Sequence, residues 1–175
     1  DKLVTGVQTC ALPIYTFQQM DKLTHTGVYG VDETLNTVQD WLGIDLNYYV
    51  KLNFSGARAI INAMDGIKVY SPVAFESSLK GYKYVKGWNK MGGKKALYFA
   101  RERHAFEGQD SIRVENQQRV IQAIIKKMTS STTLLTKYGK IMEAAGNNLS
   151  TNMTTEEMTE LAKMQLTYLS TWDVE

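Results

Sequence analysis

The fold is decided by residues 46–73, LNYYVKLNFSGARAIINAMDGIKVYSPV, in which two strand patterns flank a helix pattern. Residues 46–54 alternate polar and apolar side chains, as a half-buried strand does. Ser55 is placed to cap a helix that ends at Gly66, and residues 67–73 predict a second strand. A strand, a helix and a strand in this order favour a right-handed crossover and hence an α/β sheet.

The segments on either side continue the mixture of helices and strands. A helix is expected from Gly30, with Asp32 as its cap and Gly43 as its stop. Thr154 and Glu157 have the spacing of a capping box. Further helices are expected at residues 94–101, 110–128, 134–145 and 155–169, and a strand at residues 172–175. We therefore expect an α/β fold with α-β-α layers, in which helices cover both faces of a mixed central sheet that is truncated at both ends.

Length and composition fit one globular domain. The 175 residues are 43% apolar and 22% charged, which excludes a disordered chain, collagen and a coiled coil. No apolar run approaches the roughly 18 to 20 residues of a membrane span. The formal net charge of +2 is too small to indicate nucleic acid or an anionic membrane by itself, so partners must be argued from local charge. The single cysteine, Cys10, and the two histidines predict neither an intrachain disulfide nor a zinc site.

The first residues differ from the rest of the chain. Residues 4–14 carry no charge and include Cys10 and Pro13. One interpretation is a short edge strand that Pro13 ends. The other is that residues 1–14 are foreign, because the segment resembles the translated read-through of a sequencing adapter. On the second interpretation, which we adopt as an expectation, only residues 15–175 carry information about the fold.

The densest polar pattern lies between Arg101 and Arg119. Asp110, Arg113 and Gln117 share one face of the expected long helix. The same face continues as a buried stripe through Ile121, Ile124 and Met128. An unpaired buried polar group costs about 1 to 3 kcal/mol, and a charge costs more. These polar side chains are therefore expected to line a pocket or to meet a partner.

Two further arginines precede this helix. Arg101 and Arg103 would point in different directions on a continuous helix, so they can converge only where the helix ends, as the loop from His104 allows. Gly108 lets that loop turn back toward Arg113. Three guanidinium groups around one point require an anion between them. Phosphate or pyrophosphate fits best, because guanidinium groups bind its oxygens in pairs.

Two other interpretations explain the same charges. In the first, Arg101, Arg103, Glu102, Glu107 and Glu115 form an ordinary salt-bridged surface. In the second, the segment binds nucleic acid. The nucleic-acid interpretation is the weaker one, because the four arginines between residues 101 and 119 are balanced by four carboxylates. His25 and His104 are expected to be structural, since neither has an evident catalytic partner.

A family resemblance follows from these residues. The block Tyr98-Phe-Ala-Arg101-Glu-Arg103-His104, with Gly108-Gln-Asp110, Arg113 and Asn116-Gln117-Gln118 after it, resembles the signature of the LytR-CpsA-Psr family of cell-wall glycopolymer ligases. Residues 21–30 and 48–54 resemble two earlier segments of that family. The similarity runs from Asp21 to the end of the chain, so residues 15–175 would be a partial catalytic domain.

The resemblance implies a phosphotransferase at the extracytoplasmic face of the cell membrane. Such an enzyme moves teichoic acid, capsular polysaccharide or a similar glycopolymer from a polyprenyl-pyrophosphate carrier to peptidoglycan and uses Mg²⁺. By position, Arg101, Arg103, Arg113 and Gln117 would bind the pyrophosphate. Arg113 and Asp110 would be the catalytic residues, with Asp110 orienting an arginine or standing near the metal. No nucleic-acid partner is implied.

The sequence also departs from the family. The upstream Pro-Arg-Asp segment, the aspartates expected to bind magnesium and the membrane anchor are absent, so no metal ligand is assigned in this chain. We expect part of the pyrophosphate site but little or no ligase activity. The lipid requires an apolar tunnel, which the faces of Ile60, Ile61, Ile121 and Ile124 could line if they are not ordinary core. The alternative function is a non-catalytic transcription attenuator or a module that binds an anionic polymer.

Overall fold

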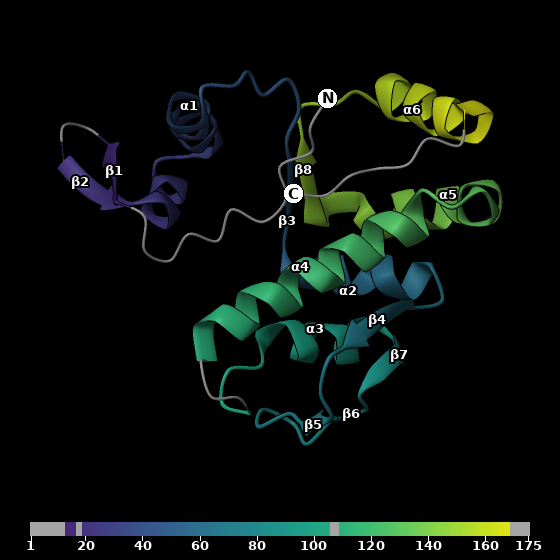
Figure 1. The fold of residues 1–175 in the computed structure, drawn as a ribbon. Coiled ribbons are helices and arrows are strands. Elements are labelled where there is room, and N and C mark those ends of the chain that lie inside the picture. Colours follow the sequence, from purple (N-terminus) through teal and green to yellow (C-terminus); the bar gives the residue numbers. More distant parts are fainter. Residues whose placement is uncertain (1–12, 17–18, 106–108, 169–175) are drawn as a thin grey trace. The chain divides into compact units, whose positions relative to one another are not determined.

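The chain forms two compact units in the computed structural model (Figure 1). The structure describes residues 13–16, 19–105 and 109–168. The smaller unit lies within residues 7–49, and the larger unit includes residues 50–175. The predictions for residues 4–12 and 172–175 lie outside the described residues. No described helix has both the length and the apolar composition needed to cross a membrane.

The smaller unit is a hairpin followed by two helices. Leu23 and Val38 are its buried apolar side chains, and Leu46 packs against them. The expected helix is confirmed, and Gly43 ends it in the left-handed conformation at φ 63°. Asp32 is not its cap, because Gly30 holds that position and Asp32 lies in the first turn. The elements are β1 (Pro13–Thr16), β2 (Gln19–Lys22), the 3₁₀ helix η1 (Leu23–Val28) and α1 (Val31–Leu42).

The larger unit contains the stretch that decides the fold, and its helices follow the sequence patterns closely. The strands are β3 (Val50–Leu52), β4 (Ile67–Ser71), β5 (Phe75–Glu76), β6 (Lys83–Tyr84), β7 (Gly87–Met91) and β8 (Leu149–Thr151). The helices are α2 (Phe54–Ala63), α3 (Gly93–Arg101), α4 (Gln109–Met128), α5 (Ser131–Ala145), the 3₁₀ helix η2 (Gly146–Asn148) and α6 (Thr155–Tyr168). Helix α2 packs against α3 and α5, and α4 packs against α3 and β4.

The α/β class is confirmed, whereas the strand pairing differs from the expected crossover. Strand β3 pairs with β8, β4 with β7 and β5 with β6, and each of these described ladders is antiparallel. The two strands that flank α2 therefore belong to different ladders. The partner of β3 lies almost one hundred residues further along the chain, and local periodicity carries no information about such a pairing.

The helix ends show which cap predictions hold. Asn53, not Ser55, caps α2, because its side-chain Oδ1 accepts a hydrogen bond from the backbone N–H of Gly56 at 2.7 Å. Ser55 lies inside the helix, one residue too late for that role. The capping box before α6 is confirmed. Glu157 accepts from the backbone N–H of Thr154 at 2.7 Å, and Thr154 accepts from that of Glu157 at 3.1 Å.

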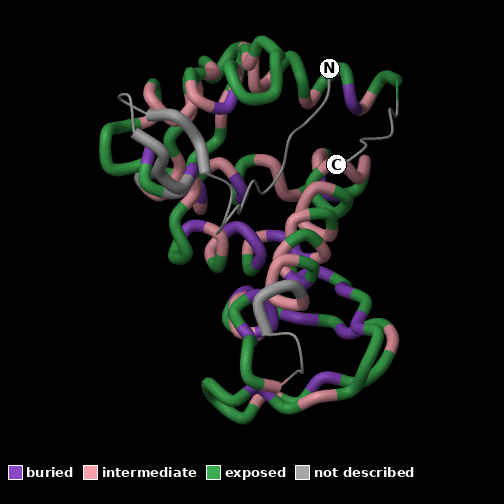
Figure 2. The backbone as a smooth tube through the Cα atoms, turned by 60° about the vertical axis from the view of Figure 1, so that its left-hand side comes forward, coloured by how far each residue is buried: buried purple, intermediate pink, exposed green. Residues whose placement is uncertain are grey.

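The core of the larger unit is built where α2, β4, β7 and α3 meet (Figure 2). Phe75, Tyr84 and Phe99 form an aromatic cluster with ring centroids 4.6 to 5.6 Å apart. Ile60 and Ile61 are buried in this core and are ordinary packing residues.

The buried line of α4 differs from the predicted stripe. It runs through Asn116, 1% exposed, and Val120, 7% exposed. Ile121 and Ile124 are half-buried, and Met128 is 37% exposed. The prediction followed apolar residues alone, whereas the polar Asn116 occupies the buried face one turn before Val120.

Candidate anion-binding site

Helix α3 ends at Arg101, as convergence of the two arginines requires. Gly93 begins the helix against the backbone of Arg58, so closely that no Cβ atom would fit there. Ala96 and Phe99 are fully buried, which fixes the rotation of the helix. Glu102 then leaves the helical conformation for an extended one, with φ −65° and ψ 132°. The chain therefore changes direction between Arg101 and Arg103.

A buried carboxylate holds this change of direction. The side chain of Glu102 is 0% exposed. Its carboxylate accepts hydrogen bonds from the backbone N–H groups of Arg103, His104 and Ala105 at 3.0, 2.9 and 3.1 Å. It also accepts from the backbone N–H and the hydroxyl of Ser78, both at 2.9 Å. The turn after α3 is thus organised around one anion that belongs to the chain itself.

The hydrogen bonds also decide the charge of Glu102. Burial acts to raise the pKa of its carboxyl group, but hydrogen bonds from Ser77, Ser78 and the backbone of the turn outweigh that effect and lower the pKa. Glu102 is therefore a buried carboxylate anion at neutral pH. The salt-bridge interpretation is wrong for this residue, because a fully buried side chain saturated by N–H and O–H donors is not part of a surface ion pair.

Sequence reasoning missed the role of Glu102. A signal was present, because Glu102 follows the core residue Phe99 by three positions and so continues the buried face of α3. The usual preference of glutamate for the surface concealed it.

The two arginines on either side of Glu102 face solvent. Both Arg101 and Arg103 are exposed. An extended residue directs its two neighbours away from its own side chain, so the inward position of Glu102 favours an outward position for both guanidinium groups. The guanidinium of Arg101 lies over the ring of Phe54 at 5.3 Å from the centroid. This cation–π contact connects the end of α3 to the start of α2.

The remaining predicted residues lie at the start of α4. Arg113 and Gln117 are half-buried, one turn apart on that helix. Asp110 is in the first turn of α4, and its side chain, like Glu107 and Gly108, is outside the described set. Because α3 packs against α4, the end of one helix and the start of the other lie side by side (Figure 1). The structure therefore brings Arg101, Arg103, Arg113 and Gln117 to the same end of this helix pair.

The described carboxylates of this region are engaged elsewhere. Glu102 accepts from the turn, and Glu115 pairs with Arg119 at 2.8 Å on the surface of α4. Arg119 also donates to Oδ1 of Asn116 at 3.0 Å, which leaves it turned toward its own helix. The arrangement can attract an anion through Arg101, Arg103 and Arg113, and the N-terminal end of α4 adds a positive helix dipole.

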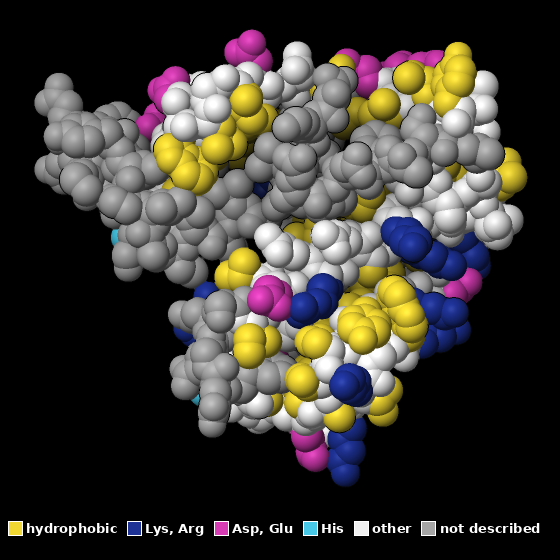
Figure 3. Space-filling model, viewed as in Figure 1, with side chains coloured by type: hydrophobic (Ala, Val, Ile, Leu, Met, Phe, Trp, Pro, Cys, Tyr) yellow, Lys and Arg dark blue, Asp and Glu magenta, His cyan; other side chains and the backbone are white. Residues whose placement is uncertain are grey.

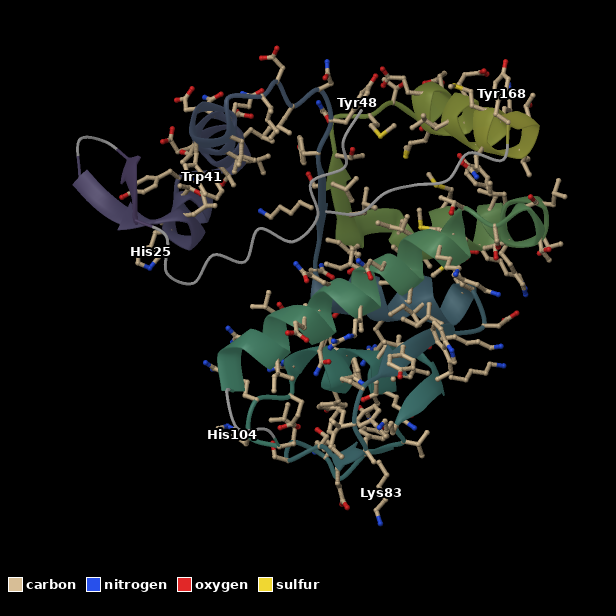
Figure 4. The ribbon with its side chains drawn as sticks, viewed as in Figure 1. His25, Trp41, Tyr48, Lys83, His104 and Tyr168 are labelled. Carbon is tan, nitrogen blue, oxygen red and sulfur yellow. The ribbon has the colours of Figure 1, made fainter. Side chains whose placement is uncertain are left out.

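The described residues do not fit a magnesium site. Over residues 19–105 and 109–168, no cluster of three or more His, Cys, Asp or Glu side chains could hold a metal ion. Glu102 is saturated by N–H and O–H donors, which a metal ligand cannot be. His104 is exposed and lies on the segment between α3 and α4 (Figure 4).

A cavity of about 480 Å³ lies apart from the arginines. Met142 and Ala145 of α5, Leu149 and Thr151 of β8 and Met158 of α6 contribute to its lining. None of the four isoleucines expected to border a lipid tunnel lines this cavity. The tunnel remains a prediction.

Comparison with known proteins identifies relatives along nearly the whole chain. The sequence profile of the LytR_cpsA_psr family matches residues 4–172. The match runs through the segment expected to be foreign, and the foreign origin of residues 1–14 stays a prediction. The polyisoprenyl-teichoic acid–peptidoglycan teichoic acid transferase TagU of Bacillus mycoides is 31% identical over 165 residues, which cover 90% of this chain and 53% of that protein. The chain thus spans about half the length of this relative.

Solved structures support the same relationship. A protein from Enterococcus faecalis, described as a transcriptional regulator, superimposes with a TM-score of 0.77 at 29% identity and covers 94% of this chain and 60% of its own. The crystal structure of Bacillus subtilis TagV gives a TM-score of 0.74 at 27% identity, with 99% of this chain and 65% of that one covered.

Proposed function

Because the chain belongs to the LytR_cpsA_psr family, we propose that it serves in the transfer of a glycopolymer, such as teichoic acid, from a polyprenyl-pyrophosphate carrier to peptidoglycan. The observation that carries the proposal is the turn organised by Glu102, which presents Arg101 and Arg103 beside Arg113 at the start of α4. The name of the Bacillus mycoides relative agrees with this reaction and leaves the carrier chemistry to be tested.

The proposed reaction is a phosphoryl transfer. The oxygen of an acceptor hydroxyl attacks the phosphorus attached to the glycopolymer. The bond from that phosphorus to the bridging oxygen breaks, the carrier leaves as polyprenyl phosphate, and the hydroxyl proton is released. Negative charge grows on the leaving phosphate, so the main requirement is that cations are already in position.

The residues of this chain would meet that requirement. Arg101 and Arg103 would bind the oxygens of the pyrophosphate, and the amide of Gln117 would donate to one of them. Arg113 would neutralise the charge that develops on the leaving group, and Asp110 would orient an arginine. Glu102 is a positioning residue, because it fixes the turn and does not face the substrate.

Magnesium and location are part of the proposal without support from the described residues. When bound, a divalent cation would add neutralising charge, and its ligands would lie outside the described residues. The extracytoplasmic face of the cell membrane and an N-terminal anchor follow from the proposed substrate alone. Because the chain spans 53% of the TagU relative, we expect the 175-residue polypeptide by itself to have little or no transferase activity.

Binding of a short prenyl pyrophosphate to the full chain, measured by calorimetry, tests the site directly. Arg113→Ala should weaken binding by about 10- to 100-fold, since each charge-assisted contact contributes about 1.5 to 3 kcal/mol. Arg119→Ala is the matched control on the same helix, and it should leave the affinity unchanged because Arg119 is engaged with Glu115. Equal affinities for wild type and Arg113→Ala would contradict the proposal.

The second candidate is a non-catalytic regulator that binds DNA or another anionic polymer. The description of the Enterococcus faecalis relative favours it, whereas the balance of arginines and carboxylates between residues 101 and 119 does not. A steep fall in DNA affinity with added salt would support this candidate. Absence of binding at low salt would remove it.

A further inference from the structure

The outward side of the β4–β7 ladder combines exposed aromatic rings with lysines. Burial alternates strictly along both strands, so that Lys68 and Tyr70 of β4 and Trp88 and Lys90 of β7 face solvent. We call these four residues the outer ladder face. Figure 3 shows hydrophobic and basic side chains adjoining one another over these strands. Tyr70 is 45% exposed and Trp88 is 66% exposed, which is unusual for side chains of this size.

The register places like residues directly opposite each other. Tyr70 pairs with Trp88, and their rings meet edge to face with centroids 5.6 Å apart. Lys68 pairs with Lys90. The aromatic pair stabilises the ladder, but two like charges in opposite positions weaken it. Stability alone therefore explains the rings and not the lysines.

The surroundings provide no counter-charge within the chain. The described carboxylates with lysine partners are used at other positions, Glu76 by Lys83 and Asp65 by Lys137. Over residues 19–105 and 109–168, none pairs with Lys68 or Lys90. The adjoining turn adds an exposed valine, Val85, and a further lysine, Lys86. An external anionic partner would relieve the repulsion on this face.

The polar groups indicate which kind of anionic partner fits. Sugar recognition requires amide or carboxylate side chains beside the rings. The amide of this ladder, Asn89, instead points inward, where it accepts from the backbone N–H of Val85 at 3.0 Å and donates to the carbonyl groups of Val85 and Gly87. What remains outside is Trp, Tyr, Val and Lys, the set that concentrates where an apolar phase meets anionic head groups.

We propose that the outer ladder face docks on an anionic phospholipid surface, with Trp88 and Tyr70 entering the interface and Lys68 and Lys90 contacting phosphate groups. This docking requires neither the arginine site nor a transferase reaction, so each can fail without the other. A soluble anionic polymer is the competing partner.

Co-sedimentation of the full chain with vesicles tests the lysines. The chain should bind vesicles made of equal parts phosphatidylglycerol and phosphatidylcholine more tightly than phosphatidylcholine alone. Lys68→Gln with Lys90→Gln should weaken binding by about fivefold per lysine, or roughly 25-fold together. Removing a repulsive pair should not unfold the ladder. The control, Lys126→Gln with Lys127→Gln, changes the same charge at exposed positions of α4 and should have less than about a twofold effect.

Quenching of tryptophan fluorescence by brominated phosphatidylglycerol tests the rings. Trp88→Phe should remove most of the quenching, whereas Trp41→Phe, which alters another exposed tryptophan, should retain it. Three results would overturn the proposal: no vesicle binding by the unaltered chain, equal losses in the two lysine double variants, or quenching that survives Trp88→Phe. A lysine-dependent affinity for soluble poly(glycerol phosphate) without vesicle binding would assign the face to an anionic polymer instead.

Discussion

The turn after α3 and the outer ladder face are both basic surfaces, but they hold their cations in opposite ways. In the turn, Arg101 and Arg103 flank the buried carboxylate of Glu102, which five hydrogen bonds from main-chain and serine donors surround. On the ladder, Lys68 and Lys90 stand on regular strands without a carboxylate partner among the described residues. A fixed backbone suits a small anion of defined shape, whereas mobile ammonium groups suit an extended surface.

The largest expected effect comes from removing the carboxylate of the turn. Glu102→Gln would place amide hydrogens against main-chain N–H groups in a fully buried position. We expect a loss of at least about 3 kcal/mol in the free energy of unfolding, because several buried donors lose their acceptor. Urea unfolding followed by circular dichroism measures it.

The matched control for this substitution is Glu115→Gln. Glu115 is exposed and pairs with Arg119 four residues later on α4. Such a pair contributes less than about 0.5 kcal/mol, so the control should unfold almost as the wild type does. Equal stabilities for the Glu102→Gln and Glu115→Gln variants would show that the turn does not depend on its buried anion. Where the Glu102→Gln variant still folds, its vesicle binding should persist.

Acid should weaken the turn next. The pKa of Glu102 is lowered from its ordinary value of 4.5 by the hydrogen bonds of the folded state, which outweigh the effect of burial. The stability that this group contributes is therefore complete above about pH 4.5 and is lost as the pH falls through the lower, folded-state pKa. Melting temperatures measured from neutral pH down to about pH 3 should fall more for wild type than for Glu102→Gln. Parallel curves would contradict the assignment.

The sequence predicted those features that depend on neighbours along the chain. The helices, the Gly43 stop, the Thr154–Glu157 box and the helix end between Arg101 and Arg103 all follow from spacing over a few residues. The pairing of β3 with β8 could not be predicted in this way, because it depends on packing between distant segments.

The candidate site divides along the same line. Residue types indicated an anion site at Arg101, Arg103, Arg113 and Gln117, and the packing of α3 on α4 brings them to one end. The role of Glu102 depends on Ser78, which lies 24 residues earlier and reaches the turn only in the folded chain. Composition assigns glutamate to the surface, so a buried glutamate that organises the backbone becomes evident only from its hydrogen bonds.

The smallest change separates stability from docking on the ladder. Lys68→Glu replaces a repulsive cross-strand pair with an attractive one opposite Lys90, so we expect the free energy of unfolding to rise by about 0.2 to 1 kcal/mol. The same substitution removes two units of positive charge from the outer ladder face and should weaken vesicle binding most strongly at low salt. Urea unfolding and co-sedimentation of one protein preparation measure both effects. If Lys68 and Lys90 served only the fold, the more stable variant would bind vesicles as well as the wild type. Opposite directions would show that the repulsion is retained for an external anion, unlike the charge of Glu102, which is neutralised within the chain.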